Sequence, residues 1–306
     1  MLFKPSRSLK VKRVLLVSLS NIGDVVLTFP VFDALRAAYP DAIIDIVAGQ
    51  KAAGFFDRNP RVGRVIVYDK GMSVARILAW VGDLRRQRYD IVIDLRNTFL
   101  PFVLSADIVT FPCFSGGGMH MKDKHFARLA SLPGKIVPSS VRSAIFLSSA
   151  VRGAAARLVG GKEGFVLVAA GAADQKKRWH EQGFLQMIRH IRARGFDVAL
   201  VGDRNDQEVA GRILKAIPDG VIDLCGRTTL LELAAVVERA SLAITNDSGV
   251  MHLASYFDKP LIALFGPTDP ALYGPWSARC VALRKSLSVV DVDPADVIAS
   301  VDELLC

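Results

Sequence analysis

Short apolar runs alternate with longer segments of helical periodicity along the chain. The run Val14–Val17 is continuously apolar, as is typical of a parallel strand covered on both faces. Residues 25–39 repeat apolar positions at helical spacing, with Pro30 near their start and Pro40 just beyond their end. The alternation continues with strands over 43–47, 65–68 and 91–94 and a helix over 74–88. This order of elements predicts a parallel, doubly wound α/β sheet.

A second alternation follows a middle region rich in Gly and Pro. Residues 111–140 read as loops with one short helix near 126–132, and a helix is expected over 144–158. Glycines at 160, 161 and 164 then suggest a hinge. The later predicted strands are 165–169, 198–201, one near 222, 242–245 and 261–265, and the helices are 181–194, 206–216, 230–239, 250–256 and 294–305.

We therefore expect two Rossmann-like doubly wound domains, residues 1–160 and 161–306, facing each other across a cleft. The last helix, 294–305, can pack back on the N-terminal domain. Ligands of such sheets bind outside the carboxyl ends of the strands, so the loops that follow the strands are the places to search for chemistry.

Composition excludes several classes of protein. Of the 306 residues, 51% are apolar and 23% charged, which excludes global disorder, and no apolar stretch reaches the roughly 18 residues that a membrane-spanning helix needs. Four cysteines without a CxxC pair argue against a disulfide scaffold and a zinc ribbon and favour a reducing compartment. The basic N-terminus resembles the start of a signal peptide, but Ser18 and Asp24 interrupt the apolar run, so a buried first strand in a cytoplasmic protein explains it better.

The excess of positive charge lies in the N-terminal half of the chain. The net charge is +9, and residues 1–160 contain 23 basic and 11 acidic residues, whereas residues 161–306 contain 16 and 19. A nucleic acid, a membrane surface or a phosphorylated substrate would suit the basic half, and a soluble protein that is merely basic is the alternative.

The loop after the first strand contains Gly23 alone where a dinucleotide-binding fold would have GxGxxG, which disfavours an NAD enzyme. Asp24 in this loop is either the cap of the following helix or a general base. In the second half, Lys176, Lys177 and Arg178 follow a strand, where cations can neutralise a diphosphate leaving group or form a solvated charge run. Trp179 beside them favours a core position over a stacking platform.

Three further loops contain candidate residues. Thr229 and Glu232 match a capping box, although Glu232 could instead bind ribose hydroxyls. Asp247 precedes a predicted helix whose first N–H groups would form an anion site, and His252 farther along it is a structural or a ligand-binding histidine. Thr268 lies in a rigid Gly-Pro turn that either walls a nucleotide pocket or is only a turn.

Taken together and in this order, these motifs resemble glycosyltransferase family 9, the bacterial ADP-heptose:lipopolysaccharide heptosyltransferases. The resemblance covers about residues 11–277 and rests on four segments, with NDSGVMHLA and GPTDP the most specific sequences. The segments are 21–30, 177–179, 246–254 and 266–270.

The resemblance implies a GT-B fold and inverting transfer of heptose from ADP-heptose to the lipopolysaccharide inner core, without a metal or any other cofactor. Asp24 matches the family's catalytic base and Lys177 its diphosphate-binding lysine. The implied donor-binding residues are Glu232 for ribose, Asp247 for heptose, Ser248 and Gly249 for phosphate, and also His252 and Thr268. Ser20, Asn21 and Gly23 are the implied acceptor-side loop.

The implied partners are a nucleotide sugar and an anionic lipopolysaccharide-core acceptor, with peripheral contact at the cytoplasmic face of the inner membrane and no nucleic acid. The sequence of residues 111–140 does not decide between an acceptor-binding segment and a solvated loop. The residues in question are His120, Lys122, Lys124 and His125. The alternative functions are transfer from another nucleotide sugar, a GT-B nucleotide-sugar epimerase, and last a non-catalytic module that binds nucleotides or nucleic acid.

Overall fold

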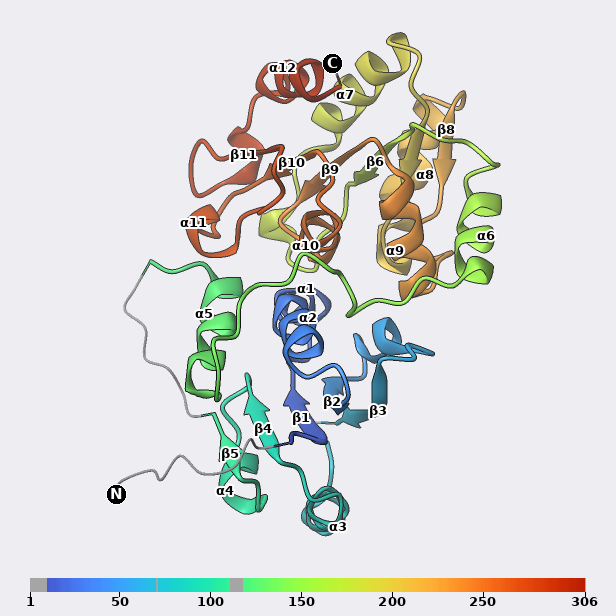
Figure 1. Cartoon of the computed structure of the whole chain (residues 1–306). Coiled ribbons are helices and arrows are strands. Elements are labelled where there is room, and N and C mark those ends of the chain that lie inside the picture. Colours follow the sequence, from blue (N-terminus) through green and yellow to red (C-terminus); the bar gives the residue numbers. More distant parts are fainter. Residues whose placement is uncertain (1–9, 70, 111–117, 306) are drawn as a thin grey trace. The chain divides into compact units, whose positions relative to one another are not determined.

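The computed structural model describes residues 10–69, 71–110 and 118–305 of the chain. It divides into two compact units, each built around its own parallel sheet (Figure 1). The first unit holds the described residues of 1–21, 28–114 and 124–144, and the second holds those of 22–27, 115–123 and 145–306. Two doubly wound α/β sheets are what the alternation of elements predicted, and this prediction is confirmed.

The sheet of the first unit has the order β3-β2-β1-β4-β5, with every pair of neighbours parallel. Its strands are β1 Arg13–Val17, β2 Ile43–Gly49, β3 Val62–Tyr68, β4 Ile91–Asp94 and β5 Ile108–Val109. The chain order reverses beside β1, which pairs with β2 on one side and β4 on the other. Ligands of doubly wound sheets bind at the carboxyl ends of the strands beside such a reversal, and the Ser20–Asn21 loop begins at that end of β1.

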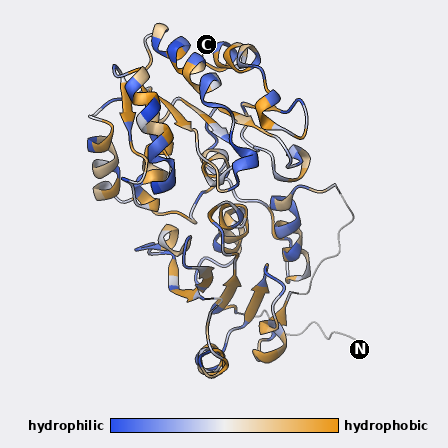
Figure 2. Cartoon of the chain, turned by 180° about the vertical axis from the view of Figure 1, so that it is seen from behind, coloured by the Kyte–Doolittle hydropathy of each residue, from blue (hydrophilic) through white to orange (hydrophobic). Residues whose placement is uncertain are grey.

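Aromatic and aliphatic side chains cover both faces of this sheet. Phe29 packs edge to face with Phe55 and Phe56, and all three are buried. Figure 2 shows the strands of the sheet as predominantly hydrophobic. The helices and 3-10 turns that follow β1 are α2 Phe29–Ala38, η1 Ala53–Phe56, α3 Val74–Arg86, α4 Leu100–Val103, α5 Met121–Ala127 and η2 Arg128–Ser131.

The second unit contains a parallel sheet of order β11-β10-β9-β6-β7-β8. Its strands are β6 Val166–Ala169, β7 Val198–Leu200, β8 Val221–Asp223, β9 Leu242–Asn246, β10 Leu261–Leu264 and β11 Cys280–Leu283. Its helices and 3-10 turns are α1 Ile22–Val26, α6 Ser149–Leu158, η3 Gln175–Lys177, α7 Glu181–Ala193, η4 Arg204–Asp206, α8 Gln207–Ala216, α9 Leu230–Arg239, α10 Gly249–Tyr256, α11 Pro270–Tyr273, η5 Val289–Asp291 and α12 Pro294–Leu304.

Two helices at the limits of this unit bear on the predicted domains. Helix α6, which the sequence pattern assigned to residues 1–160, packs against α9 and lies with the second unit. Helix α12, the predicted last helix, packs against α7, and its Val297 and Val301 enter the core that Ile188 shares.

Several predicted boundaries are wrong for local reasons. The helix expected over 25–39 is two helices, α1 and α2, because Pro30 at the first positions of α2 favours a new helix start. The helix expected from residue 144 begins only at Ser149, since the Ser148 hydroxyl caps it by accepting from Val151 N. Strand β11 was not predicted, and it is a half-buried edge strand.

Among the helices of the described residues, none combines the length and the apolar content needed to span a membrane.

Candidate functional site

Lys177 and Asp247 meet at one edge of the second sheet. Lys177 ends the turn η3 in the loop after β6, and Asp247 directly follows β9. Because β6 and β9 are parallel neighbours, both loops leave the same edge of the sheet. Lys177 Nζ donates a hydrogen bond to Asp247 Oδ2 at 2.7 Å, and the Asp247 side chain is only 6% exposed. Two residues that the sequence singled out separately thus form an ion pair.

Asn246, the last residue of β9, fastens the Lys177 loop at both of its ends. Its buried Oδ1 accepts from Trp179 N at 3.1 Å, and its Nδ2 donates to Ala170 O at 2.7 Å. This role of Asn246 was not predicted. The available signal was a polar amide ending an otherwise apolar strand, directly before a candidate carboxylate.

Arg178 is held by groups on both of its sides. Its Nε donates to Ala172 O at 2.8 Å, and one terminal nitrogen lies 3.2 Å from Asp206 Oδ1. Burial raises the pKa of Asp206, whose Oδ2 accepts from Asp203 N at 2.9 Å. The loop after β7 is thereby tied to the loop after β6.

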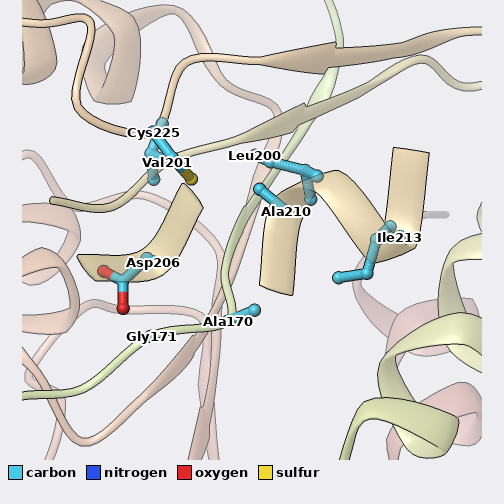
Figure 3. A pocket seen from close by; sticks show the side chains of 8 residues that line it. All are labelled: Ala170, Gly171, Leu200, Val201, Asp206, Ala210, Ile213 and Cys225. Atoms are coloured by element: carbon cyan, nitrogen blue, oxygen red, sulfur yellow. The ribbon is translucent and has the colours of Figure 1, made fainter. Parts of the chain in front are cut away.

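The Asp206 side chain lies against the backbone of the Lys177 loop (Figure 3). A Cβ added to Gly171 would overlap the Asp206 carboxylate, so glycine is required there for the close approach. A cavity of about 10 Å³ is lined by Asp206, Cys225 and Ile213 among other residues. Asp206 was not predicted as a site residue either, because its contact with Arg178 joins segments that are distant in the chain.

Trp179 is a core anchor, as the sequence favoured. It is buried, its Nε1 donates to Val292 O at 2.9 Å, and its ring packs edge to face on Phe184. The buried Trp179 side chain therefore holds in place the loop that contains the neighbouring cations Lys177 and Arg178.

The turn between β9 and α10 contains Ser248 and Gly249. Ser248 is the N-cap residue of α10 but makes no side-chain capping bond, and its buried Oγ has no hydrogen-bond partner among the described residues. The first N–H groups of a helix lack intrahelical acceptors and favour anions. Ser248 and Gly249 thus form a turn suited to phosphate oxygens.

Helix α1 packs against α10. A Cβ on Gly249 would lie 2.7 Å from the Ile22 side chain, and a Cβ on Gly23 would lie 2.9 Å from His252 Cδ2. Asp24 is the next residue of α1 and is half-buried. The structure therefore brings the predicted base to the helix that begins at the Ser248–Gly249 turn.

His252 is buried and stacks on Trp276, with ring centroids 5.7 Å apart and planes inclined by 23°. Burial, together with the nearby cation Lys177 and with His120, lowers its pKa to about 4 although Asp247 opposes the shift, so the ring is neutral at pH 7. Its Nδ1 has no hydrogen-bond partner in the part of the chain that the structure describes.

His120 packs on the edge of the same indole, with centroids 5.8 Å from those of Trp276. Its Nε2 donates to Gly274 O at 3.0 Å, because a carbonyl only accepts, and its Nδ1 accepts from Lys122 N at 3.1 Å. Both ring nitrogens of His120 are therefore satisfied by the backbone. Trp276, which the sequence analysis did not consider, joins the two histidines.

The remaining predicted residues lie in three other segments that follow strands. Glu232 forms the predicted capping box, since its Oε2 accepts from Thr229 N and Thr229 Oγ1 at 2.8 Å each. Thr268 is half-buried in the loop between β10 and α11. Ser20 and Asn21 lie after β1 in the first unit, where a Cβ on Gly49 would be 2.6 Å from Ser20 Cα.

Within the described residues, no group of three or more His, Cys, Asp and Glu side chains is placed to hold a metal ion.

Comparisons with known proteins identify relatives of this chain. The sequence profile of glycosyltransferase family 9 (heptosyltransferase) matches residues 124–292. The lipopolysaccharide heptosyltransferase 3 of Escherichia coli is 27% identical over 327 residues, which cover 92% of this chain and 96% of that protein.

Two solved structures share the fold. A glycosyl transferase of family 9 from Veillonella parvula superposes with a TM-score of 0.82 at 24% identity and covers 96% of this chain and 97% of that one. The Escherichia coli heptosyltransferase WaaC with ADP gives a TM-score of 0.79 at 21% identity, with 95% and 99% covered.

Proposed function

We propose that this chain, which belongs to glycosyltransferase family 9 and is a glycosyltransferase, transfers heptose from ADP-heptose to the lipopolysaccharide inner core. The heptosyltransferase relative from Escherichia coli supports the sugar and the acceptor, and the related enzyme solved with ADP supports the nucleotide. The charge excess of residues 1–160 suits an acceptor that carries phosphates and carboxylates.

The donor site in this proposal is the edge of the second sheet. Lys177 and the N–H groups at Ser248 and Gly249 bind the diphosphate, and Asp247 binds heptose hydroxyls. Glu232 binds the ribose through Oε1, since the capping box occupies Oε2. Neutral His252 and Thr268 complete the donor site. Cations and N–H groups fixed before the reaction stabilise the departing diphosphate most effectively.

Asp24 is the general base in this proposal. It removes the proton from the acceptor hydroxyl, which attacks the anomeric carbon while the bond to the diphosphate breaks on the opposite face, so the configuration is inverted. No metal or cofactor takes part, because the charge of the leaving group is met by protein groups. The acceptor-side loop is Ser20, Asn21 and Gly23, and the enzyme works at the cytoplasmic face of the inner membrane in peripheral contact with it.

The observation that carries this proposal is the packing of α1 on α10. Asp24 lies on α1, which contacts α10 within one compact unit, and this supports a base that acts beside the proposed donor site. A carboxylate that served only as a cap would not need this contact.

The test is the rate of ADP release from ADP-heptose with a heptose-free lipopolysaccharide acceptor. We expect Asp24→Asn to lower kcat by about 10²–10⁴-fold, the usual contribution of a general base, with unchanged ADP affinity. A variant that keeps most of its rate would overturn the role of Asp24. Full-rate ADP release without acceptor would indicate an epimerase-like reaction instead.

Heat denaturation with ADP, UDP or GDP checks the nucleotide separately. A ligand at about 100 times its Kd adds about 2.7 kcal/mol to the free energy of unfolding, which raises the Tm by several degrees. A shift with ADP alone supports the proposed donor, and a shift with UDP or GDP alone contradicts it.

A further inference from the structure

Large apolar side chains are exposed on two helices of the first unit. On α3, Leu78 is 68% and Val74 is 74% exposed, and at α4 Phe99 is 82% and Phe102 is 68% exposed. Ile77 and Val103 on the same helices are exposed as well. Single exposed apolar residues are ordinary on a protein surface, but a group of six on two helices that cover one core cluster is the pattern of an interaction site.

Each helix has an inner face that already fills the core. Leu84 of α3 is buried against Leu15 and Val92, and Leu100 of α4 is buried in the same cluster. Both helices therefore lie over one face of the sheet, and their exposed apolar residues point away from it. The first two turns of α3, residues 74–79, are exposed at every position, and Arg76 is the one charged residue among them.

We name these six residues and their two helices the α3/α4 face. Figure 2 shows α4 as a hydrophobic segment at the end of the first unit. Folding of this unit does not explain exposure on this scale, because apolar side chains lower the free energy when they leave water.

Cations border the α3/α4 face. Arg76, Arg85, Arg86 and Arg88 are all exposed on α3 or directly after it. The one acidic residue of α3 is Asp83, and it pairs with Arg64 at 3.5 Å and with Arg86 at 3.6 Å. An apolar surface with an excess of arginines fits the boundary between acyl chains and anionic headgroups, where each cation contributes about 1 kcal/mol.

We propose that the α3/α4 face docks on an anionic lipid bilayer. Val74, Leu78, Phe99 and Phe102 enter the headgroup boundary, and the arginines of α3 contact lipid phosphates. The inference rests on the proposed function in one respect, since a lipid-anchored acceptor gives the enzyme a reason to stay at the membrane. The inference adds which surface of the enzyme contacts the membrane.

The test is sedimentation of the full-length chain with vesicles of equal parts phosphatidylethanolamine and phosphatidylglycerol, and with vesicles of phosphatidylcholine alone. We expect binding to the anionic vesicles that weakens as salt is added. The double variant Leu78→Gln with Phe102→Gln should weaken binding at least about tenfold, because each side chain loses apolar burial. Leu287→Gln, which changes a side chain 72% exposed in the second unit, is the matched control and should bind as before.

The charge contribution is measured with Arg85→Gln combined with Arg86→Gln. Each lost cation should weaken binding to anionic vesicles about fivefold and leave binding to phosphatidylcholine unchanged. Equal loss on both kinds of vesicle would overturn the role of the arginines.

Activity on an acceptor stripped of its acyl chains separates this inference from the proposed function. The variants Val74→Gln and Leu78→Gln should turn over that acceptor at the wild-type rate while losing vesicle binding. Unchanged vesicle binding in the Leu78→Gln, Phe102→Gln variant would overturn the docking surface even if the enzyme is a heptosyltransferase. A dimeric wild type that becomes monomeric in this variant would also overturn it, because the face would then be an interface between two copies.

Discussion

Lys177 and Asp247 form an ion pair of 2.7 Å between loops that are 70 residues apart in the sequence. The Asp247 carboxylate is nearly buried, while Lys177 remains 29% exposed. In the absence of a donor each of these charges neutralises the other. In the proposed function, Lys177 turns to the diphosphate and Asp247 to the sugar, so the pair keeps both groups oriented until the donor arrives.

Removal of Lys177 should therefore affect both stability and rate. Lys177→Met leaves a buried carboxylate unpaired, and because the lysine is partly exposed we expect a loss of about 1–2 kcal/mol in the free energy of unfolding. The lost electrostatic stabilisation of the leaving group should lower kcat by about 10²-fold or more. Urea unfolding and initial rates measure the two effects. Lys176→Met is the matched control, since Lys176 is an exposed neighbour, and an equal loss of rate there would contradict a specific role for Lys177.

Asp206 should act as a positioning residue for the Lys177 loop through Arg178. Asp206→Ala removes the carboxylate that meets Arg178 and Asp203 N, and we expect a loss of about 1–3 kcal/mol in the free energy of unfolding. ADP affinity should fall with it, because the loop loses its support. Asp206→Asn keeps one acceptor oxygen and should recover most of both. If Asp206→Asn and Asp206→Ala behave alike in ADP titrations, the carboxylate shape does not position the loop.

Glu232 has a local role and a proposed ligand role that two variants can separate. Glu232→Ala breaks the capping box with Thr229 and should cost about 0.5–2 kcal/mol of stability. Glu232→Gln keeps the capping geometry, because glutamine also serves in this motif, and should preserve the Tm. Both variants should weaken ADP binding in calorimetry. Unchanged ADP affinity in Glu232→Gln would restrict Glu232 to capping.

Gly23 allows α1 to approach α10. Gly23→Ala would place a Cβ 2.9 Å from the buried His252 ring, so we expect a loss of about 1–3 kcal/mol and a lower kcat as Asp24 is displaced. Gly153→Ala on α6 is the control, because the added Cβ would contact only Arg157, at 3.6 Å. This substitution should stabilise the protein by about 0.5–1 kcal/mol. Wild-type activity in Gly23→Ala would show that the distance between α1 and α10 does not matter for the reaction.

Acid should destabilise the protein through two buried histidines. Burial lowers the pKa of His252 and of His125 to about 4, from an ordinary value of 6.5. Both rings stay neutral in the native state, whereas the same histidines in the unfolded chain take up protons below about pH 6.5. The free energy of unfolding therefore falls as the pH drops from about 6.5 to about 4, and the contribution of the two histidines is fully present above that window. Each histidine contributes a slope of at most about 1.4 kcal/mol per pH unit.

Urea unfolding at several pH values within this window tests the assignment. His252→Gln should reduce the slope of the free energy of unfolding against pH by the contribution of one histidine and leave the contribution of His125. An unchanged slope would mean that His252 is not neutral in the native state, and it would contradict the effect of its burial.

Features that depend on near neighbours in the chain could be predicted from the amino-acid sequence. Apolar runs and helical spacing were sufficient to predict two parallel α/β sheets, because burial on both faces imposes that pattern. The Thr229–Glu232 capping box was also readable, since all of its atoms lie within one turn. The family motifs identified residues one by one, and Lys177 with Asp247 is the pair that the fold then joined.

Contacts between residues that are distant in the chain could not be predicted in this way. The Asn246 fastening of the Lys177 loop, the contact of Asp206 with Arg178 and the stacking of His252 on Trp276 each join segments far apart in the sequence. The exposure of apolar side chains on α3 was not predicted either, because helical spacing alone does not say which apolar positions the core buries. Such contacts depend on how loops leave neighbouring parallel strands, and one-dimensional spacing carries no record of that geometry.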